Sequence, residues 1–331
     1  MTRSLRISAS LAIAAIAVAA CSSAATPAPA TQAPATQAPA TAAPATAAPA
    51  TAAPATEAPS ASAPAWASPD PNSLLGKIIA AGKVRISTDP NYAPFSFLDT
   101  ATGKYTGFDT ATAEEVVKRM NEKLGMNLQL EWATPNWDLI TAGSWGGRWD
   151  MSIGSMSVTT GREKVVDFAD PYYYDYGVIA IPQDSTAASI TDLDGKNICV
   201  GAATTYESWL KGTLEIPGTI APPPANANIT SLPTDNECVQ AYQSGRKFDA
   251  LVDNENSLAN AIKQGAPLKM LDIPPPFIVK VSPALDKSGP NTAAMLALLN
   301  EIIADMHADG TLTQLSNQYL GKDVTQAPPG I

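Results

Sequence analysis

Residues 151–174, MSIGSMSVTTGREKVVDFADPYYY, hold the pattern that decides how this chain folds. The apolar start at 151–153 predicts the end of a strand, and small and hydroxyl-bearing residues follow it. Such residues let a ligand approach the backbone closely and hydrogen-bond to it. Arg162 comes next in a polar turn, and its planar guanidinium matches a carboxylate. We therefore expect Arg162 to bind the carboxylate of a small solute. The alternative is a solvent-exposed surface arginine.

The first 21 residues predict an export signal. Arg3 and Arg6 precede an apolar run at 11–20 that is too short to span a bilayer. Residues 18–21, VAAC, resemble the lipobox of bacterial lipoproteins, in which the cysteine is lipidated. We expect residues 1–20 to be a signal peptide and Cys21 to carry a lipid. A secreted protein with an unmodified Cys21 is the alternative.

Residues 21–65 predict a disordered stalk. From residue 24 they are almost wholly Ala, Pro and Thr, in repeats such as APAT and TAAP. This composition cannot bury apolar area, and its prolines favour an extended polyproline conformation. At ~3.1 Å per residue, about 40 residues reach on the order of 120 Å when fully extended, so we interpret them as a stalk between the lipid and the folded part.

Composition excludes several classes of function. Without Arg3 and Arg6, 19 basic residues stand against 31 acidic ones, a formal charge of −12, which argues against nucleic acid as a partner. His307 is the only histidine and has no Cys or His at metal spacing, so we expect no metal site and no Ser-His-Asp site. The sequence contains neither a Walker loop nor a Rossmann fingerprint, so we expect no cofactor.

Two cysteines remain once Cys21 is assigned to the lipid. Cys199 and Cys238 form an even pair in an oxidising compartment, so we expect them to be bridged. Closing a loop of ~40 residues contributes roughly 4 kcal/mol of stability in the chain-entropy model.

From residue 74 onward, strand and helix patterns alternate. Expected strands lie at 84–88, 128–132, 151–153, 165–168, 177–181, 197–201, 249–253, 268–271 and 277–281. Expected helices lie at 109–124, 137–142, 257–264 and 311–319, with others after Thr204, after Thr234 and before Gly310. Thr204 with Glu207, and Thr234 with Glu237, read as capping boxes. The alternation predicts mostly parallel sheets covered by helices, with ligands at strand carboxyl ends.

One segment reads as an insertion. Residues 145–149, WGGRW, look like a solvated turn, with Arg148 reaching a binding cleft as the alternative.

Six motifs, in order, resemble the family 3 bacterial solute-binding proteins, the polar amino-acid receptors of ABC importers. They are TDPNYAPF at 88–95, GFD at 107–109, GSMSVT at 154–159 with Arg162, DFADPY at 167–172, DLDGK at 192–196 and ADGT at 308–311. The resemblance covers residues 74–322. It implies the type II periplasmic-binding-protein fold, in which two hinge strands join two α/β lobes and the ligand binds in the cleft. Lobe 1 is then 74–177 plus 278–322, and lobe 2 is 178–277.

The resemblance also implies roles for individual residues. Arg162 binds the α-carboxylate, and Ser155 and Ser157 add hydroxyl and backbone hydrogen bonds. Thr204 caps a helix whose first residue, Thr205, offers N–H groups to the same anion. Tyr92 and Trp137 are the residues expected to stack on the ligand.

Two positions leave alternatives open. Asp89 either faces the ligand's side chain, as in receptors for basic amino acids, or forms a turn before Pro90. The ligand's ammonium meets either Asp253 or Asn254, because the usual family spacing falls on Asn254 whereas the acid is Asp253.

The expected function is capture of a polar amino acid, without cofactor or catalysis, for delivery to an ABC permease. We expect a monomer, anchored by lipid to the outer face of the cytoplasmic membrane. One alternative is an enzyme resembling periplasmic cyclohexadienyl dehydratases, with Glu207 or Glu255 as its general acid. Another is the ligand-sensing subunit of a signalling system.

Overall fold

The computed structural model describes residues 63–329. The predicted signal peptide, the predicted lipidation site at Cys21 and the stalk up to residue 62 lie outside the described residues. Within 63–329, none of the helices combines the length and apolarity needed to cross a membrane.

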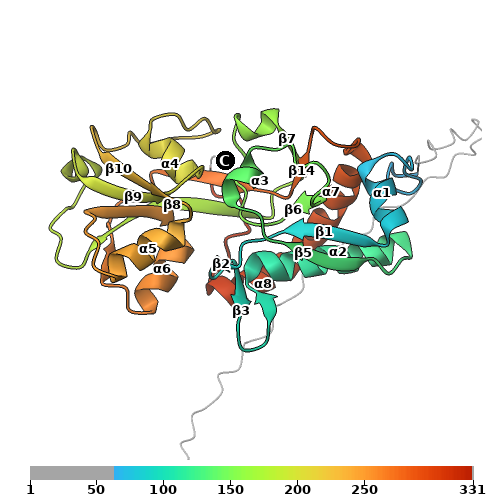
Figure 1. Ribbon diagram of the computed structural model, residues 1–331, viewed down its shortest axis with the longest axis horizontal. Coiled ribbons are helices and arrows are strands. Elements are labelled where there is room, and N and C mark those ends of the chain that lie inside the picture. Colours follow the sequence, from blue (N-terminus) through green and yellow to red (C-terminus); the bar gives the residue numbers. More distant parts are fainter. Residues whose placement is uncertain (1–62, 330–331) are drawn as a thin grey trace, which may run out of the picture. The chain divides into compact units, whose positions relative to one another are not determined.

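The first sheet has the strand order β5-β1-β6-β14-β7 (Figure 1). Its strands are β1 (Lys83–Ser87), β5 (Gln129–Ala133), β6 (Met151–Ser152), β7 (Val166–Phe168) and β14 (Ala284–Asp286). β1 runs parallel to β5 and β6, whereas β14 is antiparallel to β6 and β7. β1 and β5 can pair in parallel because the long helix α2 (Phe108–Leu124), which lies between them in the chain, returns the chain to the end of the sheet at which β1 begins.

The second sheet has the order β10-β9-β11-β8-β12, and β13 also pairs with β8. Its strands are β8 (Tyr173–Pro182), β9 (Asn197–Gly201), β10 (Asn228–Leu232), β11 (Ala250–Asn254), β12 (Leu268–Met270) and β13 (Phe277–Val281). β9 is parallel to β10 and β11. Because β8 leads in from the first sheet and β13 leads back, this antiparallel pair forms the double connection between the lobes.

Helices bury their apolar faces against the two sheets. The first lobe carries α1 (Leu74–Ala81), α2, α3 (Trp137–Thr141), α7 (Ala293–Ala308) and α8 (Thr311–Leu320). The second lobe carries α4 (Thr205–Leu210), α5 (Asp235–Gln243) and α6 (Glu255–Lys263). In α7 the whole predicted apolar face is buried: Met295, Leu298, Leu299, Ile302, Ile303 and Met306. The 3.6-residue period therefore predicted this face correctly.

Several elements were not predicted. They are α1, β10, β14 and the antiparallel sheet of β2 (Asn91–Tyr92), β3 (Ser96–Asp99) and β4 (Lys104–Thr106). β14 has three residues and exists because β6 and β7 flank it, a tertiary pairing that leaves no local period.

The turn at 145–149 is not a solvated insertion. Trp145 is fully buried and Trp149 is 4% exposed, and both pack with Ile140 and Met156. Arg148 is exposed, and its guanidinium lies 4.8 Å from the centroid of the Trp149 ring. Two indoles flanking Gly-Gly therefore fold back into the first lobe, because their apolar area outweighs the polarity of the turn.

The predicted disulfide between Cys199 and Cys238 is confirmed. It joins β9 to α5, with 5.7 Å between the Cα atoms, and both cysteines are buried. The bridge fixes α5 to the strand that leads into α4.

Candidate functional site

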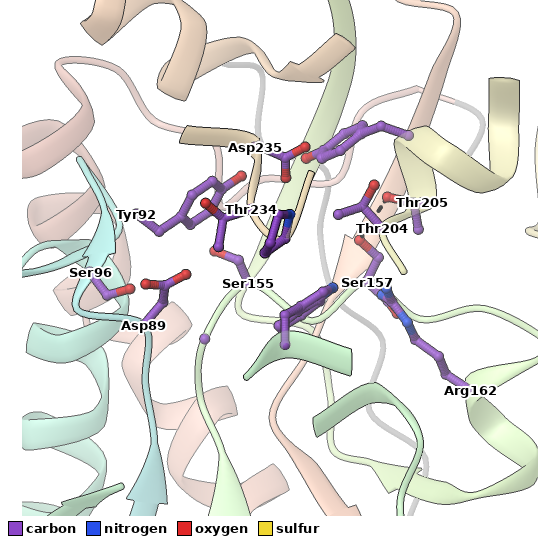
Figure 2. A pocket seen from close by; sticks show the side chains of 14 residues that line it. Asp89, Tyr92, Ser96, Ser155, Ser157, Arg162, Thr204, Thr205, Thr234 and Asp235 are labelled. Atoms are coloured by element: carbon purple, nitrogen blue, oxygen red, sulfur yellow. Dashed lines mark hydrogen bonds between the residues drawn. The ribbon is translucent and has the colours of Figure 1, made fainter. Parts of the chain in front are cut away.

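A cavity of about 50 Å³ lies where the two lobes meet, lined from both of them (Figure 2). The first lobe contributes loops after β1 and β6, and the second lobe contributes loops after β9 and β10. The carboxyl ends of these parallel strands point to the cavity, as expected for ligand sites in α/β folds. The lining comprises Asp89, Tyr92, Ser96, Trp137, Gly154, Ser155, Ser157, Arg162, Thr204, Thr205, Tyr206, Pro233, Thr234 and Asp235.

Most of the predicted ligand residues meet at this cavity. Asp89, Tyr92, Trp137, Ser155, Ser157, Arg162, Thr204 and Thr205 all line it. Asp253 and Asn254, at the end of β11, are buried next to it and do not line it.

Arg162 lies in a 3₁₀ turn (Arg162–Lys164) and is only 8% exposed, so the surface-arginine alternative is wrong. Its Nη1 donates to the Ser157 carbonyl and its Nη2 to the Ala203 carbonyl, both at 3.0 Å. The guanidinium also lies 5.3 Å from the centroid of the Trp137 ring. Burial lowers the pKa of Arg162 to about 10, so it remains charged at neutral pH. Among residues 63–329, no carboxylate forms an ion pair with it.

The serine loop after β6 is held by a buried carboxylate. Ser155 adopts a left-handed backbone (φ 55°), and its Oγ donates to Asp109 Oδ2 at 2.6 Å. Tyr172 Oη donates to the other oxygen of Asp109 and accepts from the Ser155 N–H. Ser155 Oγ is thus committed to Asp109. Ser157 Oγ lies 3.5 Å from Thr205 Oγ1 across the cavity.

The start of α4 differs from the predicted capping box. Thr204 Oγ1 accepts from the Glu207 N–H and donates to the Gly201 carbonyl. The Glu207 carboxylate, however, accepts from the Ala203 N–H and not from Thr204, and it is also bonded to Lys211 and Ser231. At α5, Thr234 Oγ1 likewise caps the Glu237 N–H, but within residues 63–329 no bond from the Thr234 N–H to the Glu237 carboxylate completes the second predicted capping box.

Aromatic side chains join the two lobes at the cavity. The Trp137 indole donates to the Ala203 carbonyl at 3.2 Å. The Tyr92 hydroxyl donates to Asp253 Oδ1 at 3.1 Å, and the Tyr92 ring stacks on Phe95. Both aromatic residues therefore link first-lobe loops to the second lobe.

Asn254 is fully used by the fold. Its Oδ1 caps α6 by accepting from Asn256 and Ser257, and its Nδ2 donates to Asp175 Oδ1 at 2.6 Å. Asp253 accepts the Asn254 N–H as well as the Tyr92 hydroxyl. Burial, with Asp235 and Asp175 nearby, raises the pKa of Asp253 well above its ordinary value.

Asp235, the first residue of α5, also faces the cavity. It is 8% exposed, and its Oδ1 accepts the Gly201 N–H at 2.6 Å. Burial raises its pKa to about 7, and the neighbouring carboxylates of Asp175 and Asp89 add to the rise. Burial similarly raises the pKa of Asp175 to about 6, although Tyr206 and Asn254 hydrogen-bond to it. The cavity lining thus combines one buried guanidinium with two carboxylates, those of Asp89 and Asp235.

Residues 84–322 match the family model of the bacterial extracellular solute-binding proteins, family 3. The chain belongs to this family.

Relatives of this family 3 protein include the L-cystine-binding protein TcyJ of Escherichia coli K12, 28% identical over 256 residues that cover 76% of this chain and 88% of TcyJ. The lysine/arginine/ornithine-binding periplasmic protein of the same organism is 27% identical over 252 residues, covering 73% and 88%. Among solved structures, the ancestral amino acid-binding protein AncCDT-1, a precursor of cyclohexadienyl dehydratase, is 28% identical with a TM-score of 0.63, covering 75% and 100%. These similarities confirm the expected α/β type II fold.

Sequence reasoning on this family 3 protein missed six lining residues: Ser96, Gly154, Tyr206, Pro233, Thr234 and Asp235. Asp235 is an acid in the first turn of a helix, where it stabilises the helix dipole. Because this helical role explains the residue, its place in the cavity was not predicted. Ser96 lies in a short strand of a sheet that was not predicted. Among residues 63–329, no three His, Cys, Asp or Glu side chains are grouped as metal ligands.

Proposed function

We propose that this protein binds a polar amino acid in the cavity and delivers it to the permease of an ABC importer. The observation that carries the proposal is the buried Arg162 guanidinium, whose described partners are two carbonyl oxygens and no carboxylate. A ligand carboxylate is a stronger acceptor than a carbonyl, so it satisfies this buried charge better. Relatives from Haemophilus influenzae and Vibrio harveyi are named as a probable and a putative amino-acid ABC transporter-binding protein, which supports the same ligand class.

The remaining ligand contacts follow from the chemistry of the lining. Ser157 and Thr205 supply hydroxyl groups beside Arg162, and Thr204 fixes the backbone that presents Thr205. Trp137 and Tyr92 pack on the ligand's apolar part. Of the two residues expected to meet the ammonium, Asn254 fits less well, because both polar atoms of its side chain are already hydrogen-bonded. Asp253 remains the proposed partner, although it lies behind the lining and is bonded to the hydroxyl of the lining residue Tyr92.

Binding is coupled to closure of the lobes, taken as 74–177 plus 278–322 and 178–277, about β8 and β13. Arg162 and Trp137 belong to the first lobe, yet both donate to the Ala203 carbonyl of the second. A ligand that contacts both lobes binds the closed arrangement more tightly than the open one, and this difference drives closure.

Export and anchoring complete the proposal. Residues 1–20 are a signal peptide, Cys21 carries lipid, and the stalk to residue 65 holds a monomeric receptor outside the cytoplasmic membrane. Incorporation of radiolabelled palmitate that is lost in Cys21→Ser tests the anchor.

An enzymatic function is the second candidate, because AncCDT-1 is a dehydratase precursor. Neither expected general acid fits this role. Glu207 is hydrogen-bonded around α4, Glu255 pairs with Lys322, and neither lines the cavity. We therefore propose a binding protein and no enzyme. Formation of an aromatic product from arogenate by the purified protein would reverse this assignment.

The test is calorimetric titration of the purified full chain, refolded to remove bound ligand, with the twenty amino acids and cystine. At least one should bind, and Arg162→Ala should weaken that binding by more than about a hundredfold, because the variant loses a buried charge-assisted contact. Arg246→Ala is the matched control: Arg246 also lies over an aromatic ring, that of Phe248, but is exposed and outside the cavity. Unchanged affinity in a folded Arg162→Ala variant contradicts the proposal.

A further inference from the structure

The tryptophan turn, residues 144–149, makes none of the proposed ligand contacts. Trp145 and Trp149 are both buried, and their ring centroids lie 5.4 Å apart. Neither residue lines the cavity. The two indoles belong to one apolar cluster, whose other buried members are Ile140, Met156, Val166 and Ala284. The turn can therefore influence a ligand only through the elements that share this cluster.

A buried hydrogen bond joins the tryptophan turn to α3. Trp145 Nε1 donates to the Ile140 carbonyl at 2.9 Å. Ile140 lies one helical turn after Trp137, the residue of α3 that lines the cavity and donates to the Ala203 carbonyl. Because α3 has only five residues, tertiary contacts and not its own hydrogen bonds decide where Trp137 lies.

The same cluster contacts the serine loop and the turn of Arg162. Met156, which is fully buried in the cluster, directly precedes Ser157. The Ser157 carbonyl accepts Arg162 Nη1. Val165 and Val166 follow the 3₁₀ turn that carries Arg162, and both pack in the cluster. One apolar cluster therefore supports three separate segments that carry groups of the binding site.

Asp286 of β14 fixes the tryptophan turn to the first sheet. Its Oδ1 accepts the Ser144 N–H at 3.0 Å, and its Oδ2 accepts the Trp145 N–H at 2.6 Å. Ser144 has a left-handed backbone (φ 55°), which is costly for a residue other than glycine and persists only where its surroundings hold it. The carboxylate bonds to two consecutive N–H groups supply this restraint, so the turn is a rigid base for the cluster.

We propose that Trp145 is a positioning residue for the carboxylate subsite: through the cluster it holds Trp137, Ser157 and Arg162 in the arrangement that receives the ligand's carboxylate. The inference rests on the proposed function, in which Arg162 binds that group. A guanidinium that is already oriented loses less freedom on binding than one that the ligand must order, so the oriented site binds more tightly. A change at Trp145 therefore weakens binding without removing any ligand contact.

The test is calorimetric titration of the refolded full chain with each of the twenty amino acids and cystine. The one that the parent protein binds most tightly is then titrated into Trp145→Phe. This variant keeps an aromatic ring but leaves the Ile140 carbonyl without its donor. We expect binding about fivefold to tenfold weaker, in a protein that shows native circular dichroism and remains folded without urea.

A double-mutant cycle separates positioning from a purely structural role. If Trp145 acts through α3, its effect must depend on the group that α3 presents. The loss of affinity caused by Trp145→Phe should therefore be at least about threefold smaller in a protein that already carries Trp137→Phe. A residue that only stabilises the first lobe would give the same loss in both backgrounds.

Two controls match the variant in stability and in chemistry. Leu298 is a fully buried residue of α7 in the same lobe, outside both the cavity and the cluster. Leu298→Ala destabilises the lobe but should bind within about twofold of the parent protein. Trp66→Phe likewise removes an indole donor, the one to Glu301 Oε2, and should also bind normally.

A second variant keeps the inference testable if Trp145→Phe does not reach native circular dichroism. Trp149 packs on Trp145, and its Nε1 has no hydrogen-bond partner within residues 63–329. Trp149→Phe therefore loses packing area alone, and we expect it to bind about threefold more weakly than the parent protein.

Three outcomes overturn the inference and leave the proposed function intact. They are affinity of the folded Trp145→Phe variant within about twofold of the parent, an equal loss of affinity in Leu298→Ala or Trp66→Phe, and an unchanged effect of Trp145→Phe in the Trp137→Phe background. Failure of the folded parent protein to bind any of the twenty amino acids or cystine instead refutes the proposed function, and the role of Trp145 with it.

Discussion

At the scale of single residues, the place of Arg162 in the cavity could be predicted from the sequence, whereas that of Asp235 could not. Arg162 follows a strand end rich in glycine and serine, and this local pattern matches its place in the cavity. Asp235 follows a capping threonine, where an acid already has a helical role. Its second role comes from Gly201, which lies 34 residues earlier in the chain.

Gly201→Ala should act through Asp235. The φ angle of Gly201 is not in the left-handed region, so the alanine at this position does not strain the backbone. The added Cβ would meet Asp235 Oδ1 at 2.5 Å and the Asp235 main-chain nitrogen at 2.8 Å. We expect at least about a tenfold loss of affinity for the ligand, measured by calorimetry, because a charged contact is displaced. Gly289→Ala, whose Cβ would meet only Asp286 O at 3.6 Å, should bind normally. Equal affinities in the two variants would contradict the role of Gly201.

At the scale of elements, long periodic segments were predictable and short paired ones were not. The apolar face of α7 and the strands β9 and β13 follow local patterns in the sequence. β14 and the sheet of β2, β3 and β4 consist of two to four residues per strand and depend on neighbours in space. The tryptophans at 145 and 149 likewise gave no local sign of which surface would cover them.

The disulfide between β9 and α5 should be a large contribution to stability. Cys199→Ala combined with Cys238→Ala should lower the free energy of unfolding by roughly 4 kcal/mol, because the unfolded chain regains the entropy of an open loop. The sequence separation is 39 residues, and both side chains are buried. Urea denaturation of the full chain measures the difference, with Cys21→Ser as the control that leaves this bridge intact. A loss below about 1 kcal/mol would show that the loop is already restrained in the unfolded state.

At the scale of the whole molecule, the buried carboxylates set how stability changes with pH. Burial raises the pKa of Asp109 and of Asp175 to about 6 and that of Asp235 to about 7, all from an ordinary value of 3.8. Between pH 3.8 and about pH 7 the folded state therefore holds more protons than the unfolded state, so the free energy of unfolding falls as pH rises. The lowered pKa of Asp309, about 2, acts only in more acidic solution.

The ligand-free protein should therefore be more stable at pH 5 than at pH 8, by on the order of a few kcal/mol. Urea denaturation at the two values measures this, and the melting temperature should follow the same direction. Asp175→Asn should flatten the dependence, since it removes one of the buried carboxylates whose pKa is raised. Greater stability at pH 8 than at pH 5 would show that these carboxylates ionise freely in the folded protein.

The sequence by itself determined the alternation of strands and helices, the family, the cysteine pair, and the set of hydroxyl and aromatic residues around Arg162. These features are local or depend on order along the chain, so periodicity and motifs record them. Only the tertiary structure decided that Asp235 lines the cavity, that Asn254 is consumed by α6 and Asp175, and that Trp145 and Trp149 are buried. Each of these features depends on which distant segment of the chain packs against the residue. The hydrophobic packing within the two lobes decides which segments come into contact.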